Sequence, residues 1–128
     1  MYAQNIGDVL DLIASDNSNP LTADGLSSAI DLQQYEGELV ATLNTPGSTG
    51  NANNTLDVTI YHSDTSGGTY TATSVAFAQV GYNTASNQKI SFLKGELKQF
   101  IKFNKDVSGT SPSYQLALNL LGVKKNPA

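Results

Sequence analysis

The chain has 128 residues, the size of a single domain with one core. Charged residues make up only 14%, and the formal net charge is −4, so the surface is polar but weakly charged. All seven basic residues are lysine, and this together with the negative charge argues against nucleic acid as a partner. The absence of cysteine excludes disulfides, thiolate zinc sites and cysteine nucleophiles.

The amino-terminal segment is the least patterned part of the sequence. It begins MYAQNIGDVLDLI, without the basic region and long apolar run of a signal peptide, and no later run is long enough to span a membrane. We therefore predict a soluble protein that is not secreted through a signal peptide. Residues 1–28 are predicted to be an arm or an edge segment, with an edge strand or short helix at Val9–Ile13.

Alternation of apolar and polar residues predicts strands through the rest of the chain, because successive side chains of a strand point to opposite faces. Ala29–Leu32 resembles a strand entering the core. The next two strands have inward positions at Leu39, Ala41, Leu43, Leu56, Val58 and Ile60. Between them, residues 45–50 form a turn because Pro46 and Gly47 do not continue a ladder.

A hairpin is predicted over residues 55–73. Its turn covers residues 63–68, where Gly67 and Gly68 can supply the positive φ of a tight turn, and a Thr-rich strand resumes at Thr69. Residues 75–80 then form a short extended piece.

Three further strands complete the pattern. Their inward positions are Ile90, Phe92, Ile101, Phe103, Leu116, Leu118 and Leu120. The stretch LKGELK is predicted to be a corner between strands, and residues 108–113 a loop. Short strands about ten residues apart predict an all-β fold, an antiparallel, jelly-roll-like β-sandwich over residues 29–125, followed by a tail at residues 126–128.

Residues able to carry out catalysis or hold a cofactor are few. His62 ends the clearest strand, two residues before Asp64, but there is no Gly-x-Ser-x-Gly elbow, so a surface role is favoured. Glu36 and Glu38 could share a strand face as a carboxylate pair, yet Gly37 between them favours a turn with solvent-facing acids. We predict no catalytic residue, no cofactor and no enzyme activity.

A metal site is not predicted either. The nearest approach to an oxygen-ligand loop is residues 51–57, which hold Asn51, Asn53, Asn54 and Asp57. Asparagine there is explained by its tolerance of left-handed turn geometry.

Tyrosine is the most distinctive polar aromatic residue of the sequence, with six copies. Tyrosine is enriched at interfaces because it combines apolar area with a hydrogen-bonding tip. Tyr61, Tyr70 and Tyr82 are predicted on or near central strands and are the candidate interface residues. The alternative is that they are half-buried strand residues favoured by β propensity.

The order of the predicted β segments resembles that of a known protein family. The hairpin TLDVTIYHSDTSGGTYTAT at 55–73 is similar to a unit of small tailed-phage virion proteins encoded beside the major capsid protein. Flanking segments follow in the same order, AIDLQQYEGELVATL at 29–43, VAFAQV at 75–80, LKQFIKFN at 97–104 and SYQLALNLLGVKK at 113–125. The chain differs from the family pattern in its late strand, where relatives tend to carry arginine in a KRYIR-like stretch and this chain has Lys98, Gln99, Phe100, Ile101 and Lys102.

The resemblance implies a capsid decoration (cement) protein with a jelly-roll or β-sandwich fold. Its expected partner is the major capsid protein, and it is expected to be a homo-oligomer, a trimer or dimer, on the outer capsid surface of a virion assembled in the host cytoplasm. Neither nucleic acid nor a membrane is an expected partner.

Two rival functions are weighed against this one. A carbohydrate-binding β-sandwich of a phage tail or secreted enzyme would stack sugars on tyrosines such as Tyr61 or Tyr82, since the chain has no tryptophan. A small hydrolase would depend on His62.

Overall fold

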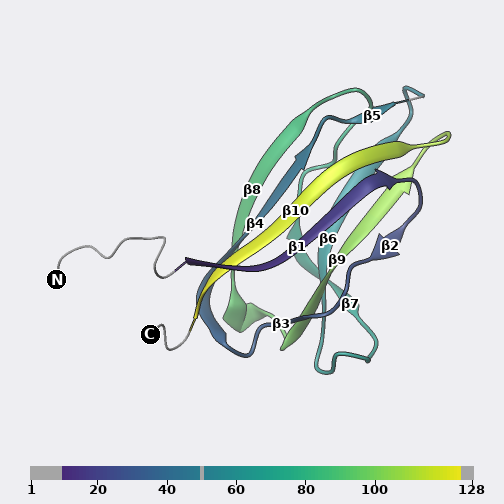
Figure 1. Ribbon diagram of the computed structural model, residues 1–128. Helices are drawn as coiled ribbons and strands as arrows, with labels where there is room; N and C mark the ends of the chain where they lie inside the picture. The colour runs from purple at the N-terminus through teal and green to yellow at the C-terminus, as the bar shows by residue number, and fades with distance from the viewer. Residues whose placement is uncertain (1–9, 50, 125–128) are drawn as a thin grey trace, which may run out of the picture.

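The computed structural model describes residues 10–49 and 51–124, which form two antiparallel sheets (Figure 1). Sheet A has the strand order β1 (Leu10–Leu21), β10 (Ser113–Lys124), β4 (Tyr35–Thr45), β8 (Ser86–Leu93), and the short β5 (Ser48–Thr49) also pairs with β10. Sheet B has the strand order β2 (Gly25–Leu26), β9 (Phe100–Ser108), β6 (Thr55–Ser63), β7 (Thr71–Ala76), and the short β3 (Ile30–Asp31) also pairs with β9.

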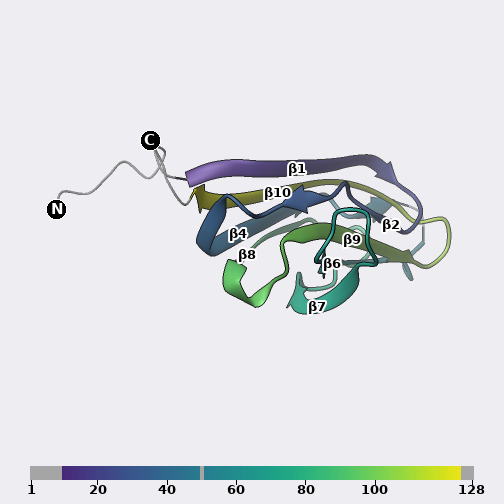
Figure 2. The ribbon, with the colours of Figure 1, turned by 90° about the horizontal axis from the view of Figure 1, so that it is seen from below.

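The path of the chain between the two sheets defines the topology. From β1 in sheet A the chain crosses to β2 and β3 in sheet B, returns to β4, and crosses again to the β6–β7 hairpin. It then alternates through β8, β9 and β10, so that the last strand lies between β1 and β4. Figure 2 shows β1 and β10 on one side of the molecule and β6, β7 and β9 on the other. This is the course of a jelly roll, and the predicted antiparallel β-sandwich is confirmed.

The core lies between the sheets and consists of the alternating positions that the sequence predicts. Each strand turns one row of side chains inward, and burial of each large aliphatic side chain contributes roughly 1.5–3 kcal/mol. The predicted positions that are buried are Leu39, Ala41, Leu43, Leu56, Val58, Ile60, Phe92, Ile101, Phe103, Leu116, Leu118 and Leu120. Ile90 is half-buried against this cluster. Leu32, in the stretch predicted to enter the core, is fully buried, and so is Tyr114, which was not predicted as a core residue.

The hairpin over residues 55–73 is confirmed, but its turn differs from the prediction. β7 begins at Thr71, and Tyr61 lies opposite Ala72. Gly67 and Gly68 are not among the residues with positive φ. Gly68 instead donates its N–H to the carbonyl of Thr65 at 3.2 Å, in a turn that requires no left-handed residue.

The stretch after β7 does not form the separate extended piece that was predicted. Val75 belongs to β7, and Val80 makes an isolated bridge with Leu56 through two backbone hydrogen bonds of 2.9 Å. The corner before β9 is confirmed and contains one turn of 3-10 helix, η1 (Lys94–Glu96).

The segment for which an arm or an edge was predicted supplies two strands. β1 runs antiparallel along β10 from Leu10 to Leu21 and forms one edge of sheet A, and β2 forms one edge of sheet B. Ile30 of β3 and the adjacent Leu32 enter the core. Residues 1–9 and the predicted tail at 126–128 lie outside the described residues.

Candidate functional site

A groove runs along one open edge of the sandwich, between β1 of sheet A and the β2–β3 segment of sheet B. It consists of two adjoining hollows with volumes of about 350 and 140 Å³. Ala14, Ala29 and Ile30 line both hollows. The remaining lining residues are Ile13, Asp31, Gln34 and Tyr35 in the larger hollow and Ser15, Asp16, Ser27 and Ser28 in the smaller. Small side chains make the groove, because they leave space between two edge strands.

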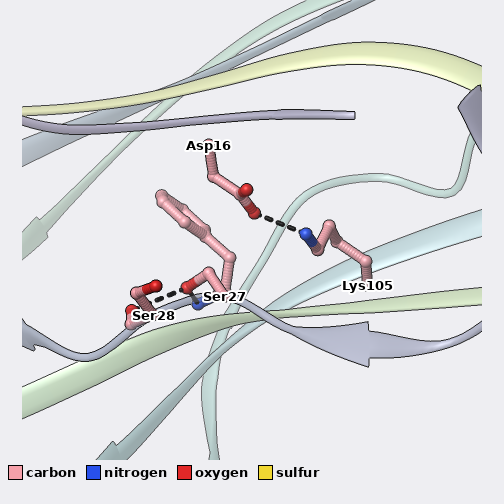
Figure 3. Close-up of polar contacts among 5 residues, drawn as sticks. Asp16, Ser27, Ser28 and Lys105 are labelled. Atoms are coloured by element: carbon pink, nitrogen blue, oxygen red, sulfur yellow. Dashed lines mark hydrogen bonds and ion pairs between the residues drawn. The ribbon is translucent and has the colours of Figure 1, made fainter. Parts of the chain in front are cut away.

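Asp16, which lines the smaller hollow, forms an ion pair with Lys105 (Figure 3). The Nζ atom of Lys105, on β9, lies 2.6 Å from Oδ2 of Asp16, on β1, so the pair joins the two sheets. The Lys105 side chain is 9% exposed and that of Asp16 is 24% exposed. Beside the pair, the hydroxyl of Ser27 donates to the carbonyl of Ser28 and accepts the N–H of Phe103, which fixes the β2–β3 segment on β9. Because the carboxylate neutralises the ammonium at this distance, we assign the pair a structural role.

The other end of the groove is held by a tyrosine. The hydroxyl of Tyr35 donates to Oδ2 of Asp11 at 3.1 Å, and Lys124 lies 3.8 Å from the same oxygen. Burial raises the pKa of Tyr35, and the hydrogen bond to Asp11 raises it further. The phenol therefore remains a neutral donor at physiological pH, tying the start of β4 to the edge strand β1.

His62 anchors a corner of the fold. It lies on β6 opposite Thr71 and Ile101, and its Nδ1 accepts the backbone N–H of Lys98 at 3.2 Å. Lys98 also pairs with the exposed Asp64 at 3.6 Å. These contacts connect the hairpin to the segment before β9.

The two candidate acids on β4 are both exposed. Glu36 lies opposite Val123 of β10, whereas Glu38 lies opposite Leu93 of β8. Gly37 between them has a φ of 74° at an irregularity of the β4–β10 ladder. Glu36 is thus a backbone neighbour of β10 and Glu38 of β8.

The explanation given above for the asparagine tract is wrong for Asn53 and Asn54, which are not among the residues with positive φ. Their role is to bind a distant loop, because the N–H of Thr110 donates to Oδ1 of Asn54 at 2.9 Å and to Oδ1 of Asn53 at 3.2 Å. Asn54 is buried and also donates to the hydroxyl of Ser48 at 3.1 Å. Within residues 10–49 and 51–124, no group of three or more acids and histidines could hold a metal ion.

The three candidate interface tyrosines are all half-buried, and they do not form one surface. Tyr61 lies opposite Lys102 of β9, and Nζ of Lys102 lies 4.5 Å from the centre of the Tyr70 ring. Tyr82 bridges to Ser48 of β5, near the start of β6. Tyr61 and Tyr70 therefore gather around one lysine, and the interface role of all three stays a prediction.

Three carboxylates gather on the outer face of sheet B, which the sequence did not indicate. Asp57 and Asp106 are cross-strand neighbours on β6 and β9, and Asp24 accepts the N–H of Val107 at 2.8 Å. The pKa of Asp106 is raised, first by a hydrogen bond with Asp24, then by burial and by repulsion from Asp24 and Asp57.

Replacing Asp106 by asparagine should stabilise the protein at neutral pH. A carboxyl with a raised pKa in the fold contributes stability when protonated and loses it as the pH rises through that pKa. Asp106→Asn removes the repulsion and keeps a donor for Asp24, with an expected gain of about 0.5 kcal/mol at this exposed position. Urea unfolding should show the gain at pH 7 and none at about pH 3, below the ordinary carboxyl pKa. Asp64→Asn should give no gain, because Asp64 faces Lys98.

Among the residues with described positions, no helix is long and apolar enough to cross a membrane. The fold and groove together define the chain as a jelly-roll β-sandwich with an open-edge groove. Comparison with known protein families finds no matching family, and comparison with curated proteins finds no matching sequence.

Solved structures provide the remaining comparison. The chain is similar in fold to PBSX exported protein XepA, with a TM-score of 0.56, 12% sequence identity and 98% of this chain covered. The match spans 40% of the length of that protein. A structure of Bacillus endospore appendages, described as disulfide-linked pili, gives a TM-score of 0.43 at 14% identity over 91% of this chain and 88% of that one.

Proposed function

We propose that this protein is a structural virion protein, which decorates the outer surface of a tailed-phage capsid and stabilises it by binding the major capsid protein. The observation that carries the proposal is the groove between two sheet edges, which is lined by small side chains together with hydroxyl and carboxylate groups. Such a surface suits a peptide segment of another protein, because the free backbone of an edge strand can bind an extended chain.

The order of β segments that resembles phage virion proteins supports the proposal, and the jelly-roll course agrees with the fold expected from that resemblance. The similar structure belongs to a protein named as exported, and a virion protein likewise has its final place outside the cell. Many copies on a shell would also make a modest contact per copy sufficient through avidity.

Carbohydrate binding is less well supported. Stacking on a sugar needs a free aromatic face, and Lys102 lies over the ring of Tyr70. A sugar would first have to displace that cation from the surface that Tyr61 and Tyr70 share.

Binding to purified heads tests the proposal. The heads are assembled from the major capsid protein of a tailed phage whose genome encodes this chain, and binding is measured by co-sedimentation. Ala29 is exposed and lines both hollows, so Ala29→Arg should fill the groove and weaken binding by about tenfold or more. Ala85→Arg adds the same side chain at an exposed loop position outside the lining residues and should leave binding unchanged.

The two parts of the proposal fail separately. If the unaltered protein does not co-sediment with heads, the capsid function is wrong. If it binds and Ala29→Arg binds equally well, the groove is not the contact surface.

A further inference from the structure

An apolar row crosses sheet A on the face that points away from the core. Leu12 of β1, Leu121 of β10 and Val40 of β4 are successive cross-strand neighbours. On the same face, Val123 and Leu93 are the next residues along β10 and β8 toward one end of the sheet. Leu12 is 58% exposed and Leu93 51%, and the other three are half-buried. A contiguous set of this kind marks an interaction surface, whereas scattered exposed leucines do not.

The charges on this face lie on opposite sides of the row. Val40 lies opposite Ser91, which extends the row to β8. On one side of the row, the next outward-facing cross-strand pair of β8 and β4 is Lys89 and Thr42. On the other side, the next such pair is Leu93 and Glu38. The lysine side also contains the uncharged cross-strand pair Ser15–Asn119. The acid side also contains Glu36, which lies opposite Val123. The face therefore carries one cation on one side of an apolar band and two acids on the other.

We propose that two copies of the chain pack sheet A against sheet A, about a two-fold axis that lies along this row. The rotation places the apolar row of one copy on the row of the other. It also exchanges the two sides, so that Lys89 of each copy meets the Leu93–Glu38 pair of its partner. A two-fold contact needs a surface complementary to itself, and this arrangement of charges meets that requirement. A partner with a charge of one sign would leave either Lys89 or Glu38 facing a like charge.

The size of the face sets the strength of the contact. The face is four strands wide, at about 4.8 Å per strand, and about seven residues long, at about 3.4 Å per residue. These dimensions give a footprint of about 450 Å² per copy. Stable interfaces bury about 800 Å² per partner, so we expect a weak dimer with a Kd in the micromolar range. This inference goes beyond the capsid proposal, because it concerns contacts between copies and holds whatever else the protein binds.

Sedimentation equilibrium of the full chain from about 5 to 500 µM tests the dimer, since this range brackets a micromolar Kd. The average mass should rise from that of one copy to that of two. Leu12→Lys should weaken the association by about tenfold or more. Leu26→Lys is the matched control, because Leu26 is 46% exposed on β2 of the opposite sheet, and this variant should associate normally. Circular dichroism checks that both variants fold.

The charge arrangement has its own test. Lys89→Glu should weaken the dimer, and adding Glu38→Lys to it should restore association by exchanging the two signs. A protein that remains a single copy at 500 µM, a limiting mass of three copies, or equal effects of Leu12→Lys and Leu26→Lys would each overturn the proposal. If the double variant does not regain association, the proposed position of the two-fold axis is wrong.

Discussion

Lys105→Met should lower the free energy of unfolding by about 3 kcal/mol, the low end of the cost of breaking a buried ion pair. The substitution keeps most of the volume of the side chain but leaves the carboxylate of Asp16 without its counterion at 2.6 Å. The low end applies because Asp16 is 24% exposed and can recover part of its hydration. Urea unfolding at pH 7, followed by circular dichroism, measures the change.

Two further variants separate the cost of an orphaned charge from the value of the pair. Lys105→Met combined with Asp16→Leu replaces both ions by apolar groups, and it should recover most of the loss. Lys98→Met breaks the pair with Asp64, whose side chains are 46% and 80% exposed, and should change stability little. A Lys105→Met protein as stable as the unaltered chain would show that the pair contributes nothing to holding the sheets together.

The position of Asp16 suggests why such a pair is present. Asp16 lies on β1, an edge strand of 12 residues that could otherwise pair with another chain. An inward-pointing charge on an edge strand opposes slippage and misplaced pairing, because any other register would bury it without a partner. The pair thus specifies one register of β1 against β10 and one placement of sheet A on sheet B.

The strands of this fold could be predicted because each depends on a local pattern. Leu56, Val58 and Ile60 alternate with polar residues, and that alternation is sufficient to place them inside. The inward position of Lys105 follows the same alternation from Ile101 and Phe103, but its partner is 89 residues away in a stretch without apolar patterning. Nothing in the local sequence indicates which strand of sheet A will supply the partner of Lys105.

The same limit applies to the groove and to the asparagine tract. Ala29 and Ala14 carry no chemical signature, and they form a groove only because β1 and the β2–β3 segment lie at the same open edge. Asn53 and Asn54 were interpreted through their own backbone preferences, whereas their amides bind Thr110, more than fifty residues further along the chain. Residues that act through distant contacts are the ones that local patterns miss.

The contact between the asparagine tract and the loop before β10 leads to the second prediction, a large loss of stability in Gly109→Ala. Gly109 has a φ of 114°, a region that is costly for any residue with a side chain. A methyl group there would lie 2.7 Å from Cα of Asn54 and 2.8 Å from the carbonyl oxygen of Asn53, and these are backbone atoms that cannot rotate away. It would also contact the Asn54 side-chain oxygen that accepts the N–H of Thr110. We expect a loss of about 3 kcal/mol in the free energy of unfolding.

Gly67→Ala is the matched control, because Gly67 has no positive φ and open space around its Cα. It should leave stability unchanged or raise it by up to about 1 kcal/mol through a less flexible unfolded chain. Hydrogen exchange gives a second, local measurement, since the Thr110 amide should lose protection in Gly109→Ala well before the amides of β6. Equal stabilities of the two variants would mean that the contact between the asparagine tract and the loop before β10 does not hold this end of the sandwich.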